Sequence, residues 1–169
     1  ILAKARAIYD WTVDNSFRDP KTRGCGLGDV PTLLGRPGGK CADISSLYVA
    51  IARSAGVPAR EILGLRLGKE DGTDITGWQH CWAEFYLPGT GWVAVDPADV
   101  RKAMLKQKLE LSDPKVAELR EYFFGTVDPY RIKMSEGRDL TLNPPQQGLP
   151  INYLMYPFAQ VGGQTIDWL

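Results

Sequence analysis

The segment from Gly38 to Pro58 constrains the fold of this chain more than any other. Two glycines are followed closely by Cys41, and apolar residues then recur at the spacing of one buried helical face: Ile44, Tyr48, Ile51, Ala52 and Ala55. Gly56 can supply a left-handed C-cap and Pro58 cannot continue the helix, so the helix is predicted to end there. Cys41 lies three residues before Ile44, which places it on the inward face of the first helical turn.

The rest of the sequence predicts an α+β domain around that helix. Helices are expected at 1–14, 102–109 and 115–124, a long glycine- and proline-rich loop at 15–40, and strands at 60–67, 78–87, 92–96, 130–134, 140–142 and 151–156. In the first helix, one face would carry Ile1, Ala5, Ile8 and Trp11. Residues 1–169 are expected to form one domain within a longer polypeptide, because the chain starts in helical rhythm without a methionine and stops at Leu169 without a cap.

The charge and composition of the chain limit the classes of molecule that it is expected to bind. With 20 basic and 20 acidic residues the chain has no formal net charge, so nucleic acid and anionic membranes are disfavoured. The longest purely apolar stretch, Leu47–Ala52, is far too short to span a membrane. Three cysteines leave at least one unpaired within the chain, and histidine chemistry must use the single histidine.

Cys41, His80 and Asp96 are the candidates for nucleophilic chemistry. A helix N-terminus stabilises a thiolate through its unpaired N–H groups and the helix dipole, and Cys41 is predicted to lie at one. A nucleophile also needs a base within hydrogen-bond reach and a third group that orients the base. His80 is the only imidazole, and Asp96 ends the following strand.

The register of strands 78–87 and 92–96 tests whether His80 and Asp96 can meet. Facing residues of an antiparallel pair keep a constant index sum, and residues on one face differ by even steps. A four-residue loop at 88–91 would pair Leu87 with Trp92 and turn Asp96 away from His80. We therefore predict a three- or five-residue loop, or a bulge.

Four segments resemble the transglutaminase-like superfamily, of bacterial or archaeal type: Gly39–Leu47 (GKCADISSL), Arg53–Arg60 (RSAGVPAR), Gln79–Glu84 (QHCWAE) and Gly91–Pro97 (GWVAVDP). They cover residues 38–97 well, whereas the residues after 97 match weakly. The resemblance implies a papain-like fold with a nucleophile helix packed on an antiparallel sheet. It also implies acyl transfer through a thioester, with Cys41 as nucleophile, His80 as general base and then acid, and Asp96 orienting His80.

The chain departs from animal transglutaminases in two respects. Those enzymes place a tryptophan upstream of the nucleophile to stabilise the oxyanion, but no tryptophan lies between Trp11 and Trp78. The Cys41 N–H can donate one hydrogen bond to an oxyanion, and a second donor is expected from the loop at 24–30. No acidic cluster has the spacing of a calcium loop, so calcium activation is not carried over, and no cofactor or metal is expected.

Other residues divide between the cleft and the core. Gly39 would let a substrate approach closely, and Trp82 and Trp92 would wall a substrate cleft. Cys81 faces away from His80 and is expected in the core. Cys25 could be structural, pair with Cys81 or line the site, and the first is favoured. A zinc site made of Cys25, Cys41, His80 and Cys81 is disfavoured because no paired-ligand spacing exists.

These patterns predict a cysteine enzyme that acts on a peptide or protein. Attack of Cys41 on an amide carbonyl would give a thioester that is released either to water, as in a peptidase or amidase, or to an amine, as in a transglutaminase. Hydrolysis is favoured slightly because no amine site is evident. The alternative is a non-catalytic peptide-binding module that keeps the fold. An exported, periplasmic location fits the resemblance, and a cytoplasmic one stays open.

Overall fold

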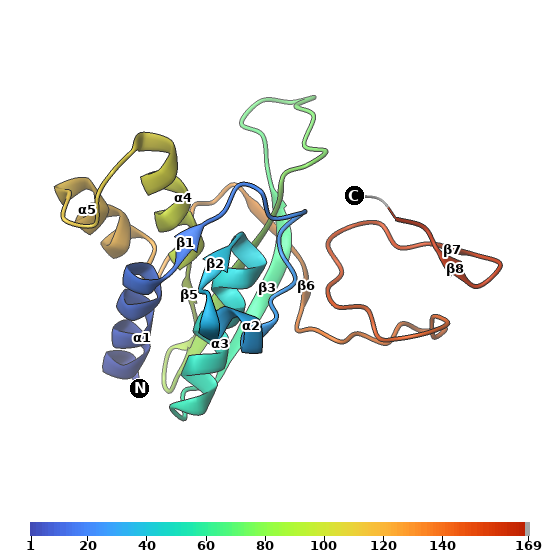
Figure 1. The fold of residues 1–169 in the computed structure, drawn as a ribbon, viewed down its shortest axis with the longest axis horizontal. Coiled ribbons are helices and arrows are strands. Elements are labelled where there is room, and N and C mark those ends of the chain that lie inside the picture. The colour runs from blue at the N-terminus through green and yellow to red at the C-terminus, as the bar shows by residue number, and fades with distance from the viewer. Residues whose placement is uncertain (168–169) are drawn as a thin grey trace.

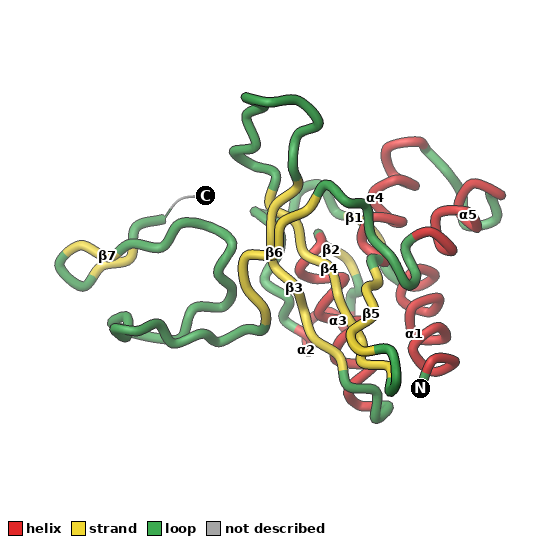
Figure 2. The backbone as a smooth tube through the Cα atoms, turned by 180° about the vertical axis from the view of Figure 1, so that it is seen from behind, coloured by secondary structure: helices red, strands yellow, loops and turns green. Residues whose placement is uncertain are grey.

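A computed structural model describes residues 1–167 and shows an α+β fold around a four-stranded antiparallel sheet, as the sequence predicts. The strand order is β5-β4-β3-β6. Helices α2 and α3 lie behind the sheet in Figure 2, and α1 and α4 pack against α3 (Figure 1). The elements are α1 (Leu2–Asn15), β1 (Phe17–Arg18), α2 (Val30–Gly35), β2 (Gly38–Gly39), α3 (Cys41–Ser54), β3 (Ala59–Arg66), β4 (Gln79–Leu87), β5 (Gly91–Val95), α4 (Pro97–Gln107), α5 (Pro114–Tyr122), β6 (Arg131–Glu136), β7 (Gln160–Val161) and β8 (Gln164–Thr165).

Helix α3 begins at Cys41 because a carboxylate caps its first turn. Asp43 accepts hydrogen bonds from the Lys40 N–H at 2.9 Å and from the Gly28 N–H at 2.8 Å. An acid in the first turn also interacts favourably with the positive end of the helix dipole. At the other end Gly56 has a φ of 77°, which is the left-handed conformation that the sequence predicts.

The hairpin between β4 and β5 has the register that a contact between His80 and Asp96 requires. Leu87 pairs with Gly91, which leaves a loop of three residues, 88–90. The index sum is therefore even, and residues 80 and 96 lie on the same face of the sheet. The prediction of a three- or five-residue loop is confirmed.

Residues 15–40 hold more regular structure than expected. Strands β1 and β2 pair in parallel, and α2 begins after Asp29, whose side chain caps it. Two glycines of this segment pack against α3, because a Cβ atom at Gly26 or Gly39 would lie 1.8 or 2.1 Å from an Asp43 carboxylate oxygen. The prediction of little regular structure is wrong here, since these glycines serve close packing as well as turns.

Helix α1 is rotated relative to its predicted face. The buried side chains are Ala5, Ile8, Tyr9, Thr12 and Val13, whereas Ile1 and Trp11 are exposed. The apolar pattern of this helix is weak, and the inward face is decided by contact with α3 and α4.

The segment after β6 also differs from its prediction. The strands expected at 140–142 and 151–156 reduce to a single bridge between Leu140 and Ile151, followed by the hairpin β7–β8. Figure 1 shows this part of the chain extending beside the body. The prediction that the chain belongs to a longer polypeptide rests partly on its end at Leu169, and residues 168–169 lie outside the described residues.

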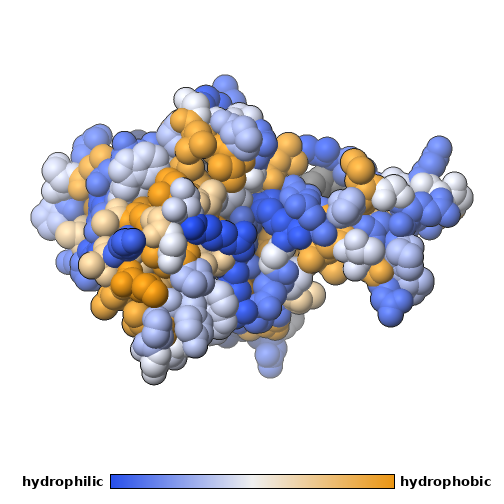
Figure 3. Space-filling model, turned by 90° about the horizontal axis from the view of Figure 1, so that it is seen from below, coloured by the Kyte–Doolittle hydropathy of each residue, from blue (hydrophilic) through white to orange (hydrophobic). Residues whose placement is uncertain are grey.

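Two groups of buried side chains form the core. The larger connects α1, α3 and the sheet around Tyr9, Tyr48 and Phe85. The smaller surrounds Cys41 and contains two further cysteines and Met155. On the face seen in Figure 3, apolar and polar residues are interspersed. No helix within residues 1–167 combines the length and the hydrophobicity that crossing a bilayer requires.

Candidate active site

Cys41 and His80 lie on the wall of one cavity of about 570 Å³. Cys41 comes from the N-terminus of α3 and His80 from the start of β4, so the cavity lies where the helix meets the sheet. Each residue is only 2 % exposed. The cavity is therefore the place where a substrate would reach the Cys41 sulfur.

The Asp96 carboxylate holds the His80 ring. Nε2 of His80 lies 2.7 Å from Oδ2 of Asp96, which leaves Nδ1 of the ring for another partner. The second oxygen of Asp96 accepts the Asp99 N–H at 2.9 Å, because Asp96 is the N-cap of α4. Asp96 is fully buried. This arrangement can fix both the tautomer and the orientation of the ring.

Arg131 neutralises the buried acids although no sequence motif marks it. Its guanidinium donates to Oδ2 of Asp96 at 2.5 Å and to Oδ2 of Asp99 at 3.0 Å, and its side chain is 3 % exposed. Arg131 lies in β6 and reaches these acids only because β6 pairs with β3, far along the chain from Asp96. No local signal in the sequence could have identified it.

The charges around His80 set its protonation state. Burial alone lowers the pKa of His80, but the negative charges of Asp96 and Asp99 outweigh burial and raise it to about 9. Burial raises the pKa of Asp96, whereas the positive charges of His80 and Arg131 lower it to about 2. At neutral pH the ring is therefore an imidazolium beside a carboxylate.

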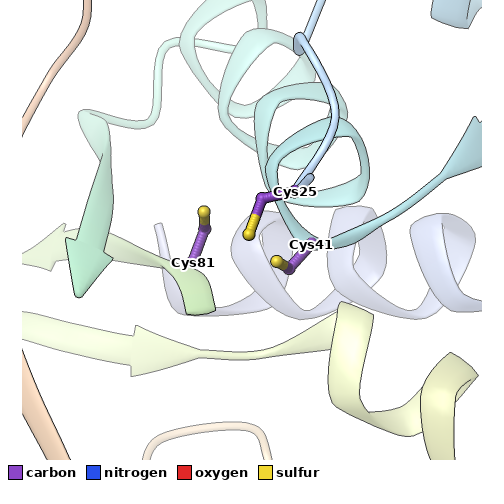
Figure 4. A group of neighbouring side chains, drawn as sticks. All are labelled: Cys25, Cys41 and Cys81. Atoms are coloured by element: carbon purple, nitrogen blue, oxygen red, sulfur yellow. The ribbon is translucent and has the colours of Figure 1, made fainter. Parts of the chain in front are cut away.

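Three cysteine sulfurs converge next to this ring. The Sγ atoms of Cys25, Cys41 and Cys81 all lie within 4.8 Å of one another, and all three are free thiols (Figure 4). Hydrogen bonding from Cys25 and Cys81 holds the pKa of Cys41 well below its usual value, against burial, and His80 lowers it further. Hydrogen bonding to Cys41 raises the pKa of Cys25 to about 12. Cys41 is therefore the thiolate of the group.

Cys25 lines the cavity beside Cys41 and is 4 % exposed. The Tyr156 hydroxyl donates to its sulfur at 3.3 Å. Of the alternatives that the sequence leaves open, the structure therefore supports a place in the site. Cys81 is fully buried, as expected for the core, but its sulfur also approaches Cys41 and lies 3.6 Å from Sδ of Met155.

Two groups of side chains are close enough to hold a metal ion. The three cysteine sulfurs offer soft ligands of the kind that Zn²⁺ or Cu⁺ prefers. His80, Asp96 and Asp99 form the second group, but Arg131 already donates to both of its carboxylates. The four-ligand zinc set considered from the sequence does not form one group, because His80 clusters with Asp96 and Asp99 rather than with all three sulfurs.

The cavity wall also offers hydrogen-bond donors for an oxyanion. The Cys41 N–H is the first of α3 and has no acceptor within the helix. Gly24 and Cys25, from the loop expected to supply a second donor, lie on the same wall. Gln79 lies there too and carries a side-chain amide. Its position directly before His80 was the only sequence signal for it.

The three residues predicted to bind substrate are not among those that line the cavity. Trp82 is 5 % exposed and stacks on His80 with ring centroids 6.2 Å apart, so it supports the ring. Trp92 is exposed and contacts Arg60 and Tyr86 outside the cavity. Gly39 packs on Asp43. Trp78 is the tryptophan on the cavity wall.

A sequence model of the transglutaminase-like superfamily matches residues 1–97, more than half of the chain. The chain belongs to this superfamily. The matched region contains Cys41 at the helix N-terminus together with the His80–Asp96 pair. The family match therefore includes the residues that meet at the cavity.

Several known proteins resemble this transglutaminase-like chain over part of their length. An uncharacterized protein of Haemophilus influenzae is 42 % identical over 98 % of this chain and 50 % of its own length. A protein-glutamine gamma-glutamyltransferase of Pseudomonas aeruginosa is 31 % identical over 56 % of this chain and 15 % of its own length. The periplasmic domain of TgpA from Pseudomonas aeruginosa matches with a TM-score of 0.46 at 24 % identity, over 62 % of this chain and 41 % of that one. The chain spans half or less of these proteins.

Proposed function

We propose that this transglutaminase-like domain is a cysteine enzyme that transfers an acyl group from a peptide or amide through a thioester on Cys41. The observation that carries the proposal is the meeting of Cys41, at a helix N-terminus, and the Asp96-bound His80 on one cavity. A thiolate beside an imidazolium is the ready form of such a nucleophile.

The first half of the reaction uses this ion pair. The Cys41 thiolate attacks the amide carbonyl carbon, and the carbonyl oxygen takes up the negative charge within reach of the Cys41 N–H. The C–N bond then breaks, and the His80 imidazolium gives its proton to the departing amine. A thioester and a neutral His80 remain. Asp96 keeps the ring in place throughout and stabilises its charged form.

The second half reverses the roles. Neutral His80 takes a proton from water or from an incoming amine as that nucleophile attacks the thioester. The C–S bond breaks, the Cys41 thiolate is restored, and the product is a carboxylic acid or a new amide. We propose water as the main acceptor, because the described cavity wall has no feature that would favour an amine over water.

The test is alkylation of Cys41 by iodoacetamide across a range of pH, with the modified residue identified by peptide mapping. The low pKa of the Cys41 thiol predicts rapid labelling well below the ordinary thiol pKa of about 8.5, and His80→Ala is expected to shift labelling toward that value. The outcome against an enzyme, and in favour of a peptide-binding module, is an ordinary thiol titration of Cys41 in the folded wild-type protein.

A second measurement separates the two acceptors. A labelled library of glutamine-containing peptides is incubated with the protein, with and without a labelled primary amine. Cleavage or deamidation alone identifies a hydrolase, and incorporation of the amine identifies a transglutaminase. Cys41→Ala is the control, because it removes the nucleophile and leaves Cys25 and Cys81 in place.

A further inference from the structure

The cavity beside Cys41 has an unusual charge. Its lining includes five basic side chains and, among the described residues, no carboxylate; the five are Arg18, Lys40, Arg66, Lys102 and Lys106. The chain as a whole has no formal net charge. The positive charge is therefore local to this cavity, where a low-dielectric wall strengthens its effect on a bound ion.

Most of these cations lack a carboxylate partner. Arg66 pairs with Asp99 and lies 3.7 Å from Asp128. Within residues 1–167, no ion pair compensates Arg18, Lys40, Lys102 or Lys106. Burial lowers the pKa of Lys102, and the neighbouring cations lower it further although the negative charge of Asp99 opposes them. A bound anion would relieve this repulsion.

The basic residues come from elements that only the fold brings together. Arg18 lies in β1, Lys40 immediately precedes the nucleophile, and Lys102 and Lys106 are one turn apart on α4. They are not a basic run in the sequence, so a solvated charged segment does not explain them. The surface that they form opens on the same cavity as the Cys41 sulfur.

We propose that this cavity selects an acidic peptide, in which aspartate or glutamate side chains lie within a few residues of the amide that Cys41 attacks. The proposal rests on the proposed function, because only an acyl compound can form a thioester on Cys41. Nucleic acid would supply negative charge but no such acyl carbon. A cavity of about 570 Å³ is of the size that holds a small ligand or a few residues of a chain.

The first test needs no turnover. Iodoacetate and iodoacetamide react with the same sulfur and differ in charge, so the ratio of their rates at Cys41 reports the field in the cavity. We expect Lys102→Gln combined with Lys106→Gln to lower this ratio about fivefold, and salt to lower it in the wild type but less in the variant. The matched control is Lys115→Gln with Lys133→Gln, which removes two positive charges outside the cavity.

An unchanged ratio in the cavity variant, or an equal fall in the control, overturns the proposal. Because the ratio compares two reagents on one thiol, a change in the pKa of Cys41 cancels. Circular dichroism of both variants confirms that they are folded.

The second test uses peptides with one common glutamine amide, flanked by aspartate and glutamate, by asparagine and glutamine, or by lysine. The acidic peptide is expected to have the highest kcat/KM, and the cavity variant to reduce that advantage. Equal turnover of all three peptides refutes the acidic substrate and leaves the cysteine enzyme intact. If no peptide reacts while the alkylation ratio responds to the cavity lysines, the anion site stands and the proposed function fails.

Discussion

His80 lies between two different environments. On one side, Asp96, Asp99 and Arg131 form a fully ionic group with short, directed hydrogen bonds. On the other side, the Cys41 sulfur lies within 4.8 Å of two neutral thiols, those of Cys25 and Cys81, which help to hold its pKa below the usual value. The ionic side fixes the ring, whereas the sulfur side leaves a charged nucleophile with soft neighbours and an open cavity. The ionic side therefore sets the orientation of the His80 ring, and the sulfur side sets the reactivity of Cys41.

The largest expected effect comes from the ionic side. Asp96→Asn keeps a cap for α4 but favours the wrong tautomer of His80, and we expect kcat to fall about 10⁴-fold. The measurement is turnover of the best peptide from the library. Asp128→Asn is the matched control, because Asp128 bonds Arg131 without touching His80. A similar loss in both variants would mean that the effect does not come from the direct contact between Asp96 and His80.

Arg131→Met tests whether the ionic side also stabilises the fold. The substitution removes the guanidinium from two buried carboxylates and leaves only His80 beside Asp96 and Arg66 beside Asp99, and we expect the free energy of unfolding to fall by about 3–5 kcal/mol. Denaturant titration measures it. Arg131→Lys keeps the positive charge but cannot bond both carboxylates as the guanidinium does, so it should recover part of the lost free energy of unfolding. A loss below about 1 kcal/mol for Arg131→Met would show that Asp96 needs no partner other than His80.

The pH dependence of stability probes the ionic side without mutation. The pKa of Asp96 is lowered to about 2, so its contribution is present above the unfolded pKa of about 4 and is lost as pH falls toward 2. The expected loss is on the order of 2–3 kcal/mol. His80 has its pKa raised to about 9, so its contribution is full below about pH 6.5 and fades as pH rises through 9.

Thermal unfolding of the wild type and of Asp96→Asn between about pH 2 and pH 9 measures both the acidic loss of stability and the alkaline loss. If the stability of the two proteins changed with pH in the same way below pH 4, the acidic loss could not be assigned to Asp96.

The smallest effect is expected on the sulfur side. Cys81→Ala removes one of the two thiols that hold down the pKa of Cys41, and we expect that pKa to rise, with about tenfold less thiolate at acidic pH. Cys81→Ser restores a donor and should restore most of the reactivity. Iodoacetamide kinetics against pH measure the shift. No change in Cys81→Ala would mean that His80 and the helix N-terminus alone stabilise the thiolate.

Local patterns in the sequence predict the central part of the fold. The helix that begins at Cys41 and the strands that follow it obey short-range rules of periodicity and capping. The odd-length loop after Leu87 was predicted only because a contact between His80 and Asp96 requires it. The same rules fail for residues 15–40 and for the strand expected at 151–156, where packing against α3 or a single bridge decides the conformation.

The candidate site divides in the same way. Three motifs in the sequence mark Cys41, His80 and Asp96, and register alone shows that the last two can meet. Asp128 is a local partner of Arg131, but nothing local marks the contact of Arg131 with Asp96 and Asp99, which lie 35 and 32 residues away. The sequence does not place Trp82 and Trp92, since alternation along a strand gives a face but does not say whether that face meets a cavity, the core or solvent.

The sequence by itself determined which atoms can react here: one imidazole, one cysteine at the start of a helix, and one acid at the end of the strand that follows the imidazole. Only the tertiary structure decided their charge, because the pKa of each group depends on what long-range packing places beside it. Arg131, the two neighbouring thiols and the basic cavity wall come from separate elements, and electrostatic interactions depend on distance through space rather than along the chain.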